Sequence, residues 1–263
     1  MTRIIHKYRA YSRLAVTKAW HERFELLARM ALLPLFLGIF DALWTAIAQG
    51  AMPIDASPRQ MVWYLAVTQW ILFSSPHPEF EFEQQVRRGD VAYQLARPLT
   101  LLGAICAEGL GTLMVNAIAF GIASFGSALL FTGALPVHPA RLLLAIPLGL
   151  VGAMVLFMFH IAIGFCAFWF RNIAPFGWIW SKATFVLGGL MLPLPLYPDW
   201  LKGAAESTPF AHALYGPASY LLDAGAGGIQ RLLVGQLAWL GSALCISSFL
   251  HRSAIKTLAI DGG

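Results

Sequence analysis

The hydrophobic pattern of the chain consists of long apolar blocks separated by short polar segments. The blocks cover approximately residues 30–48, 60–75, 101–133, 142–170, 173–192 and 232–250. Most of them reach the ~20 residues that an α-helix needs to cross a hydrocarbon core about 30 Å thick. The pattern therefore predicts an all-α membrane protein with six transmembrane helices within residues 28–252. The second block is short. The third is longer than one perpendicular crossing, and because no charged turn divides it, we expect one long tilted helix.

Three segments outside these blocks have patterns of their own. Residues 1–27 carry basic side chains, with Ile4, Tyr8, Tyr11 and Ala15 recurring at helical spacing, which is typical of an amphipathic interfacial helix at the cytoplasmic surface. Residues 193–228 are rich in proline, glycine and aromatic residues and are too apolar for a solvated loop. We expect short re-entrant helices there, dipping into the outer leaflet and packed against protein. Residues 253–263 are expected to form a cytoplasmic tail.

The distribution of Lys and Arg predicts the orientation, because cytoplasmic loops carry the excess of these residues. With the N-terminus inside, the cytoplasmic side holds Arg3, Lys7, Arg9, Arg13, Lys18, Arg23, Arg29, Arg87, Arg88, Arg97, Arg171, Arg252 and Lys256. The external side holds only Arg59, Arg141, Lys202 and Arg231. We therefore predict that both termini are cytoplasmic.

Composition agrees with a membrane protein and changes the interpretation of the charge. Hydrophobic residues make up 58% of the chain, more than the roughly 45–50% of soluble domains. Charged residues make up 12%, about half of the roughly 25% found in soluble domains. The net charge of +5 could suggest a nucleic-acid partner. Because the basic residues gather at the N-terminus and in particular loops, we attribute them to membrane orientation and predict membrane lipid, not nucleic acid, as a partner.

The polar segment 76–100 contains the most informative motif. It reads Arg87-Arg88-Gly89-Asp90, then Tyr93, Leu95 and Arg97-Pro98. A short amphipathic helix with projecting Arg and Asp side chains can dock into a groove of a cytoplasmic partner, because arginine forms directional bonds. From the charges alone, a loop whose arginines meet only lipid phosphates is an equal alternative. Arg97-Pro98 is expected to break the cytoplasmic helix before the next span.

This motif resembles the pattern arginine–x–glycine–acid, tyrosine–x–leucine–x–arginine–proline of permease subunits of type-two ABC transporters. The stretch 192–217 is similar to that family's segment between its fifth and sixth helices. The family usually has a glutamate and a further acid after the glycine, whereas Asp90 is followed here by Val91 and Ala92.

The resemblance implies a transmembrane permease subunit of an ATP-driven exporter in the bacterial cytoplasmic membrane. Two permeases, identical or homologous, would enclose the substrate pathway, lined chiefly by the first, second and fifth helices, and would work with separate ABC ATPase subunits. The residues implied for ATPase coupling are Arg87, Arg88, Gly89, Asp90, Tyr93, Arg97 and Pro98.

Motifs for nucleotide or metal binding are weak. No G-x-x-x-x-G-K-[ST] sequence occurs, so ATP and magnesium are expected in the partner ATPase and no cofactor is expected on this chain. His77, Glu79, Glu81 and Glu83 are of metal-ligating types, but acidic residues between aromatics are more often a solvated face. We therefore predict no metal site.

Ionisable residues inside apolar blocks are functional candidates, because burying a charge in the membrane is costly. They are Asp41, Glu108, His160 and Lys182, and we add Trp44 to the candidate pathway or gating residues. Each has a structural explanation as well: Asp41 as a helix–helix hydrogen bond or counter-ion of Lys182, Glu108 by reaching water, and His160 as a hydrogen-bonded core residue.

Two other function classes remain open at this level. An ion-coupled transporter would use Asp41, Glu108 and Lys182 as a proton relay. A membrane-embedded lipid-modifying enzyme would need His160 and the acidic residues, without a clustered catalytic set. Drugs, peptides, lipids and glycolipids suit an apolar, aromatic-rich pathway equally well.

Overall fold

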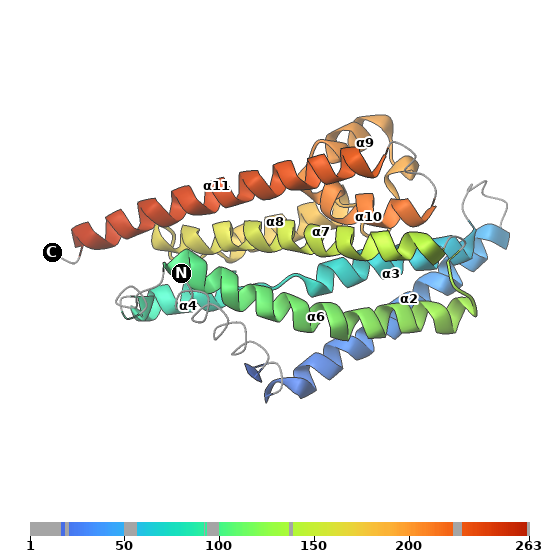
Figure 1. The fold of residues 1–263 in the computed structure, drawn as a ribbon, viewed down its shortest axis with the longest axis horizontal. Helices are drawn as coiled ribbons and strands as arrows, with labels where there is room; N and C mark the ends of the chain where they lie inside the picture. The colour runs from blue at the N-terminus through green and yellow to red at the C-terminus, as the bar shows by residue number, and fades with distance from the viewer. Residues whose placement is uncertain are drawn as a thin grey trace.

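The described part of the chain is entirely helical. The computed structural model describes residues 17–18, 21–49, 57–91, 93, 100–136, 139–222 and 228–261, and within these ranges no strand occurs. Four helices there are long and apolar enough to cross a membrane: α2 (Arg23–Gln49), α6 (Leu101–Thr132), α7 (Pro139–Phe165) and α11 (Ile229–Asp261). Figure 1 shows α6, α7 and α11 along the length of an elongated bundle, with α2 lying obliquely to them. The prediction of an all-α membrane protein is confirmed at this level, while the number of crossings stays a prediction.

The second and fifth predicted spans are the two shorter helices. α3 (Pro58–Ser74) has 17 residues and α8 (Ala174–Leu187) has 14. At 1.5 Å per residue these lengths are about 26 and 21 Å, less than a hydrocarbon core of about 30 Å. Every residue of α3 from Met61 to Ile71 is buried, so other protein elements surround this helix on all sides. α8 ends before residue 192 because Gly188 and Gly189, the latter at φ +63°, turn the chain away.

The overlong third block forms one helix, as predicted. α6 begins at the N-cap Thr100, whose hydroxyl accepts from the Gly103 amide, and continues for 32 residues, about 48 Å. α11 is also longer than its apolar block and remains helical through Asp261. Residues 253–261, predicted as a tail, therefore continue the last helix.

The proline-rich segment after α8 folds into a series of short helices. They are η2 (Leu194–Leu196), α9 (Asp199–Glu206), the π-helix η3 (Ala211–Tyr215), α10 (Gly216–Ser219) and η4 (Tyr220–Leu222). Two hydroxyls of α3 hold the start of this segment: Tyr64 donates to the Gly189 carbonyl, and Thr68 donates to the Leu190 carbonyl at 2.9 Å. The predicted short helices are present, and their depth in the outer leaflet stays a prediction.

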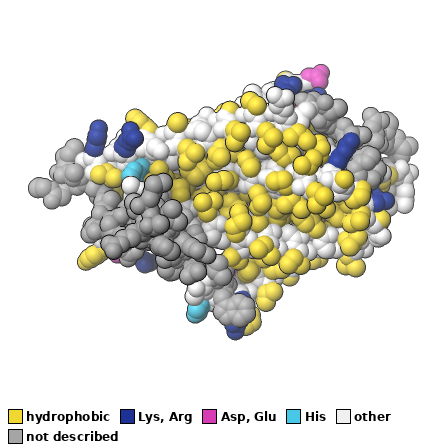
Figure 2. All heavy atoms as spheres, viewed as in Figure 1, with side chains coloured by type: hydrophobic (Ala, Val, Ile, Leu, Met, Phe, Trp, Pro, Cys, Tyr) yellow, Lys and Arg dark blue, Asp and Glu magenta, His cyan; other side chains and the backbone are white. Residues whose placement is uncertain are grey.

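Hydrophobic side chains cover the outside of the bundle as well as its core. Only 11% of the apolar window of α2 and 17% of that of α11 are buried, against 50% for α7. Figure 2 shows hydrophobic side chains across the middle of one face and Lys and Arg near its ends. Such a surface suits lipid or another membrane subunit rather than water.

The two ends of the bundle carry different elements. One end, which we call the α4 end, holds α4 (Glu79–Arg88), the start of α6 and the last turns of α11. The other, the α9 end, holds α9, α10 and the start of α3 (Figure 1). The candidate coupling segment lies at the α4 end.

Candidate functional site

The glycine of the sequence motif ends α4. Gly89 has φ +78°, a left-handed conformation that side chains disfavour, and its amide donates to the Val86 carbonyl at 3.1 Å. The Asp90 amide donates to the Gln85 carbonyl at 3.0 Å. Together these bonds satisfy the last carbonyls of the helix and turn the chain. The structure thus gives the motif glycine a backbone role.

One face of α4 is anchored in an aromatic cluster. Phe82 is buried and packs against Phe165 of α7 with ring centroids 5.3 Å apart, and against Phe168 at 5.8 Å. Val91, just past the helix, is buried in the same cluster. α4 and α7 are therefore joined by close side-chain packing.

The opposite face of the segment points outward. Arg87, Arg88, Gly89 and Asp90 are exposed, and the ring of Tyr93 is 78% exposed. Arg87 forms an ion pair with Glu83 one turn earlier at 3.5 Å, and because its side chain is 64% exposed, the guanidinium is accessible to another protein. The motif residues that the structure describes are therefore all accessible at the end of α4. Arg97 and Pro98 lie outside the described residues.

An ion pair that the sequence does not predict joins α4 to the segment before α2. Lys18 Nζ lies 2.8 Å from Glu81 Oε2, with both side chains partly exposed. Partial burial opposes the charge of Lys18, but the hydrogen bond and charge of Glu81 outweigh it and raise the Lys18 pKa. Exposed pairs of this kind stabilise little, so the contact positions the segment more than it stabilises the fold. The predicted interfacial helix at 1–27 otherwise lies mostly outside the described residues.

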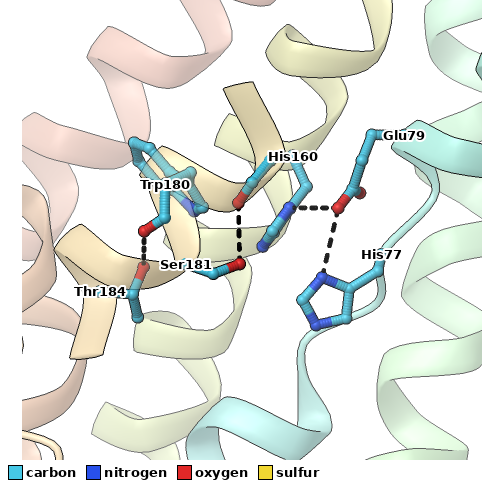
Figure 3. A network of polar contacts seen from close by, with 7 residues as sticks. His77, Glu79, His160, Trp180, Ser181 and Thr184 are labelled. Carbon is cyan, nitrogen blue, oxygen red and sulfur yellow. Dashed lines mark hydrogen bonds and ion pairs between the residues drawn. The ribbon is translucent and has the colours of Figure 1, made fainter. Parts of the chain in front are cut away.

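A buried carboxylate lies where α3, α4 and α7 meet. His77 follows α3, Glu79 is the first residue of α4, and His160 lies on α7 (Figure 3). Glu79 Oε1 is 2.9 Å from His160 Nδ1 and 3.4 Å from His77 Nδ1. The two imidazole rings have centroids 4.2 Å apart. We call these three residues the His–Glu–His cluster.

The cluster is shielded from solvent on most sides. Glu79 is 1% and His160 4% exposed, whereas the His77 side chain is 39% exposed. Burial on its own would raise the pKa of the Glu79 carboxyl, but the contacts with His160 and His77 lower it to about 2. Glu79 is therefore ionised at neutral pH, inside the protein.

A glycine on α7 permits this close approach. A Cβ atom at Gly164, one turn after His160, would lie 3.3 Å from the Glu79 Cα, so the first turn of α4 sits directly against the α7 backbone. Figure 3 shows Trp180 of α8 beside the cluster. Ser181 and Thr184 of the same helix donate to carbonyls one turn back and not to the carboxylate.

The expectation of a solvated acidic face at 79–83 is therefore wrong for two of its three carboxylates. Glu79 and Glu83 are buried, while Glu81 is exposed as expected. The sequence signal available was the spacing His77-Pro78-Glu79 next to an apolar helix. Nothing in the sequence indicated that His160 would join it.

The candidate pathway residues lie on different sides of the bundle. Trp44 of α2 is buried, and its indole nitrogen finds no hydrogen-bond partner within the described part of the chain, while Asp41 is partly buried. Lys182 is exposed on α8. α2 packs against α3 and α6, and α8 packs against α7 and α9. Between these two described residues no ion pair forms, so Asp41 is not the counter-ion of Lys182 within one chain.

The α9 end contains a cavity of about 250 Å³. It lies between the short helices and the start of α11, and Glu206 and Arg231 are its charged lining residues, beside His212, Tyr215 and Tyr220. The sequence had suggested a re-entrant segment here without indicating a cavity.

Comparison with known proteins identifies the family. The model of the ABC-2 family transporter protein matches residues 57–262, which include α3, the whole of α4 and the His–Glu–His cluster. The chain belongs to the ABC-2 transporter family. This ABC-2 chain is thus a transmembrane transport permease and not itself an ATPase. No curated protein and no solved structure matches it significantly.

Proposed function

We propose that this ABC-2 permease is half of the membrane part of an ABC exporter in the bacterial cytoplasmic membrane. Two permeases, identical or homologous, enclose the pathway, and two separate ATPase subunits bind at the α4 end, which faces the cytoplasm. Both termini lie on that side, and the chain crosses the membrane six times. The exposed motif face of α4, on a helix packed firmly against α7, is the observation that supports this proposal best.

The packing of α4 suits transmission of movement. The ATPases bind ATP and Mg²⁺, come together, and push on the surface formed by Arg87, Arg88, Asp90 and Tyr93. Because Phe82 and Glu79 hold α4 against α7, α4 cannot move far without moving α7. The displacement therefore passes from the cytoplasmic surface into the membrane-spanning bundle. The permease does no bond-making chemistry, because the ATPases supply the energy.

The pathway follows from the distribution of exposed polar groups. A charge facing lipid at the bilayer centre costs about 2.5–3.5 kcal/mol on insertion scales. Lys182 is exposed in this chain, so its face of α8 adjoins a second permease or an aqueous pathway. α3 is buried inside the chain and α2 is largely exposed. We therefore assign α2 and α8 to the pathway surface and α3 to its support.

The coupling proposal is tested by charge reversal on α4. We expect that the chain, purified from its native membrane, brings an ABC ATPase with it. The double variant Arg87→Glu, Arg88→Glu is expected to lose that ATPase and ATP-driven transport. Arg252→Glu, an exposed basic residue near the same end on α11, serves as the matched control and is expected to keep both.

Two results would overturn the proposal. One is that no ATPase accompanies the permease. The other is that the double variant keeps full transport while correctly inserted. Flux driven by a pH gradient without ATP would instead support an ion-coupled transporter. Asp41, Glu108 and Lys182 lie on three different helices, α2, α6 and α8, and no described ion pair links them into a relay.

A further inference from the structure

We propose that His77, Glu79 and His160 form a binding site for a divalent transition-metal ion of the zinc class, which reverses the prediction from the sequence that no metal site is present. The site lies at the junction of α3, α4 and α7. It is independent of which substrate the permease transports and of which ATPase drives it.

The donor set matches the preferences of zinc. Two imidazoles and one carboxylate are the three protein ligands of many open zinc sites, which keep a fourth position for water. One ligand atom from each residue lies within 4.8 Å of the others. Calcium and magnesium prefer six or more oxygen ligands, and this cluster offers one carboxylate, so these ions are poor candidates.

The distances agree with tetrahedral coordination. Zn–N and Zn–O bonds of about 2.0–2.2 Å at tetrahedral angles place neighbouring ligand atoms roughly 3.3 Å apart. The two His–Glu distances are 2.9 and 3.4 Å, close to this value, and the three ligand atoms lie within 4.8 Å of one another, so the two imidazole rings would move together around a bound ion. Both Nδ1 atoms approach the same carboxylate oxygen, so the three ligand residues are gathered at one place.

The hydrogen bonding of the cluster is incomplete without another partner. Among the described residues, buried Glu79 Oε2 has no hydrogen-bond partner, and His160 Nδ1 lies 2.9 Å from Oε1 without completing a well-directed hydrogen bond. A buried carboxylate with one unpaired oxygen is costly unless it is paired or coordinates a metal. A cation bound by both carboxylate oxygens of Glu79 and by His160 Nδ1 supplies the missing partner for Oε2 and for the ring nitrogen.

The cluster is accessible to solvent on the His77 side and enclosed by packed side chains on the His160 side. The His77 side chain is partly exposed, which gives an entry route and room for a water ligand. His160 is held in the middle of the α7 packing, with Trp180 edge-on at 6.2 Å between ring centroids. The bound ion ties α4 to α7 at the first turn of the coupling helix.

The test is direct metal binding by the full chain. The protein is purified through an affinity tag without histidine, stripped with a chelator and titrated with Zn²⁺. Co²⁺ is used in parallel as a spectroscopic probe. We expect about one tightly bound ion per chain and the visible absorption of tetrahedral Co²⁺.

The variants separate this site from other histidines. His77→Ala is expected to weaken Zn²⁺ binding by at least about tenfold and to change the Co²⁺ spectrum, because removing even an outer-shell partner costs 10–100-fold. Glu79→Gln and His160→Gln are expected to do the same if they fold. If those two buried variants do not fold, His77→Ala still tests the site, because the His77 side chain is partly exposed and its removal disturbs the core less. His21→Ala removes an exposed histidine and is expected to leave binding unchanged.

Two outcomes would overturn the proposal. The wild-type chain does not bind Zn²⁺ or Co²⁺ tightly, or His77→Ala binds as the wild type does. In either case the cluster is only a polar anchor between α4 and α7. Since the readout uses neither ATP nor transport, its failure leaves the proposed permease function untouched.

Discussion

Truncation of Phe82 provides the sharpest test of how α4 is attached to the membrane bundle. Phe82 is 4% exposed and packs on Phe165 and Phe168. Phe→Ala changes in buried cores cost about 3–5 kcal/mol. α4 lies outside the proposed hydrocarbon region, so its buried face meets water when the helix detaches from α7. The hydrophobic free energy of burying Phe82 therefore contributes in full to holding α4 in place.

This loss is expected to act locally. A cost of about 3 kcal/mol, at 1.4 kcal/mol per factor of ten, raises the open population of α4 about a hundredfold or more. Global unfolding of the spans is affected less, since the core around α3 does not include Phe82. We therefore expect α4 to detach from α7 while the bundle stays folded.

Hydrogen exchange of the α4 amides in lipid nanodiscs measures this opening. In Phe82→Ala, exchange across Glu79–Arg88 is expected to rise about a hundredfold, whereas α7 and α3 remain protected. ATP-driven transport falls in parallel. Phe80→Ala is the matched control on the same helix, because Phe80 is 39% exposed and loses less buried surface. Unchanged α4 exchange in Phe82→Ala, or an equal rise in both variants, would refute the packing argument.

Three further predictions concern single positions. Gly89→Ala places a side chain at φ +78° and is expected to destabilise the end of α4 by about 1–2 kcal/mol, measured by hydrogen exchange; an unchanged rate would contradict the left-handed cap. Gly152→Ala is expected to lower the melting temperature sharply, because its Cβ would lie 2.2 Å from the Ala213 carbonyl oxygen, while Gly126→Ala, with open space around it, is tolerated. Lys182→Met is expected to keep or improve thermal stability in lipid but to reduce transport; full transport would remove Lys182 from the pathway.

The sequence could predict the class of fold because it depends on local chemistry. Long apolar blocks can satisfy their backbone hydrogen bonds in lipid only as helices, so an all-helical membrane protein follows from block length alone. The undivided block at 101–133 gave one long helix for the same reason. The motif around Gly89 also has a local cause, since a helix end with φ above zero selects glycine.

Helix ends and burial were less predictable. Apolar composition continued through residue 192, but α8 ends at Leu187, where Gly188 and Gly189 redirect the chain to contact α3. Burial is a second property that the apolar pattern leaves open, because an apolar block does not indicate whether its helix faces lipid or protein. α3 and α2 have similar composition, yet one is enclosed and the other largely exposed.

The sequence by itself determined that this chain is a helical membrane permease with an exposed arginine-rich segment. Only the tertiary structure decided that His160 meets Glu79, that Glu79 is buried, and that Asp41 and Lys182 stand apart. The physical reason is that hydrophobic periodicity reports the secondary structure of each helix and its need for apolar surroundings. Contacts between residues far apart in the chain depend on which helices pack together, and that packing is set by steric details such as the missing side chain of Gly164.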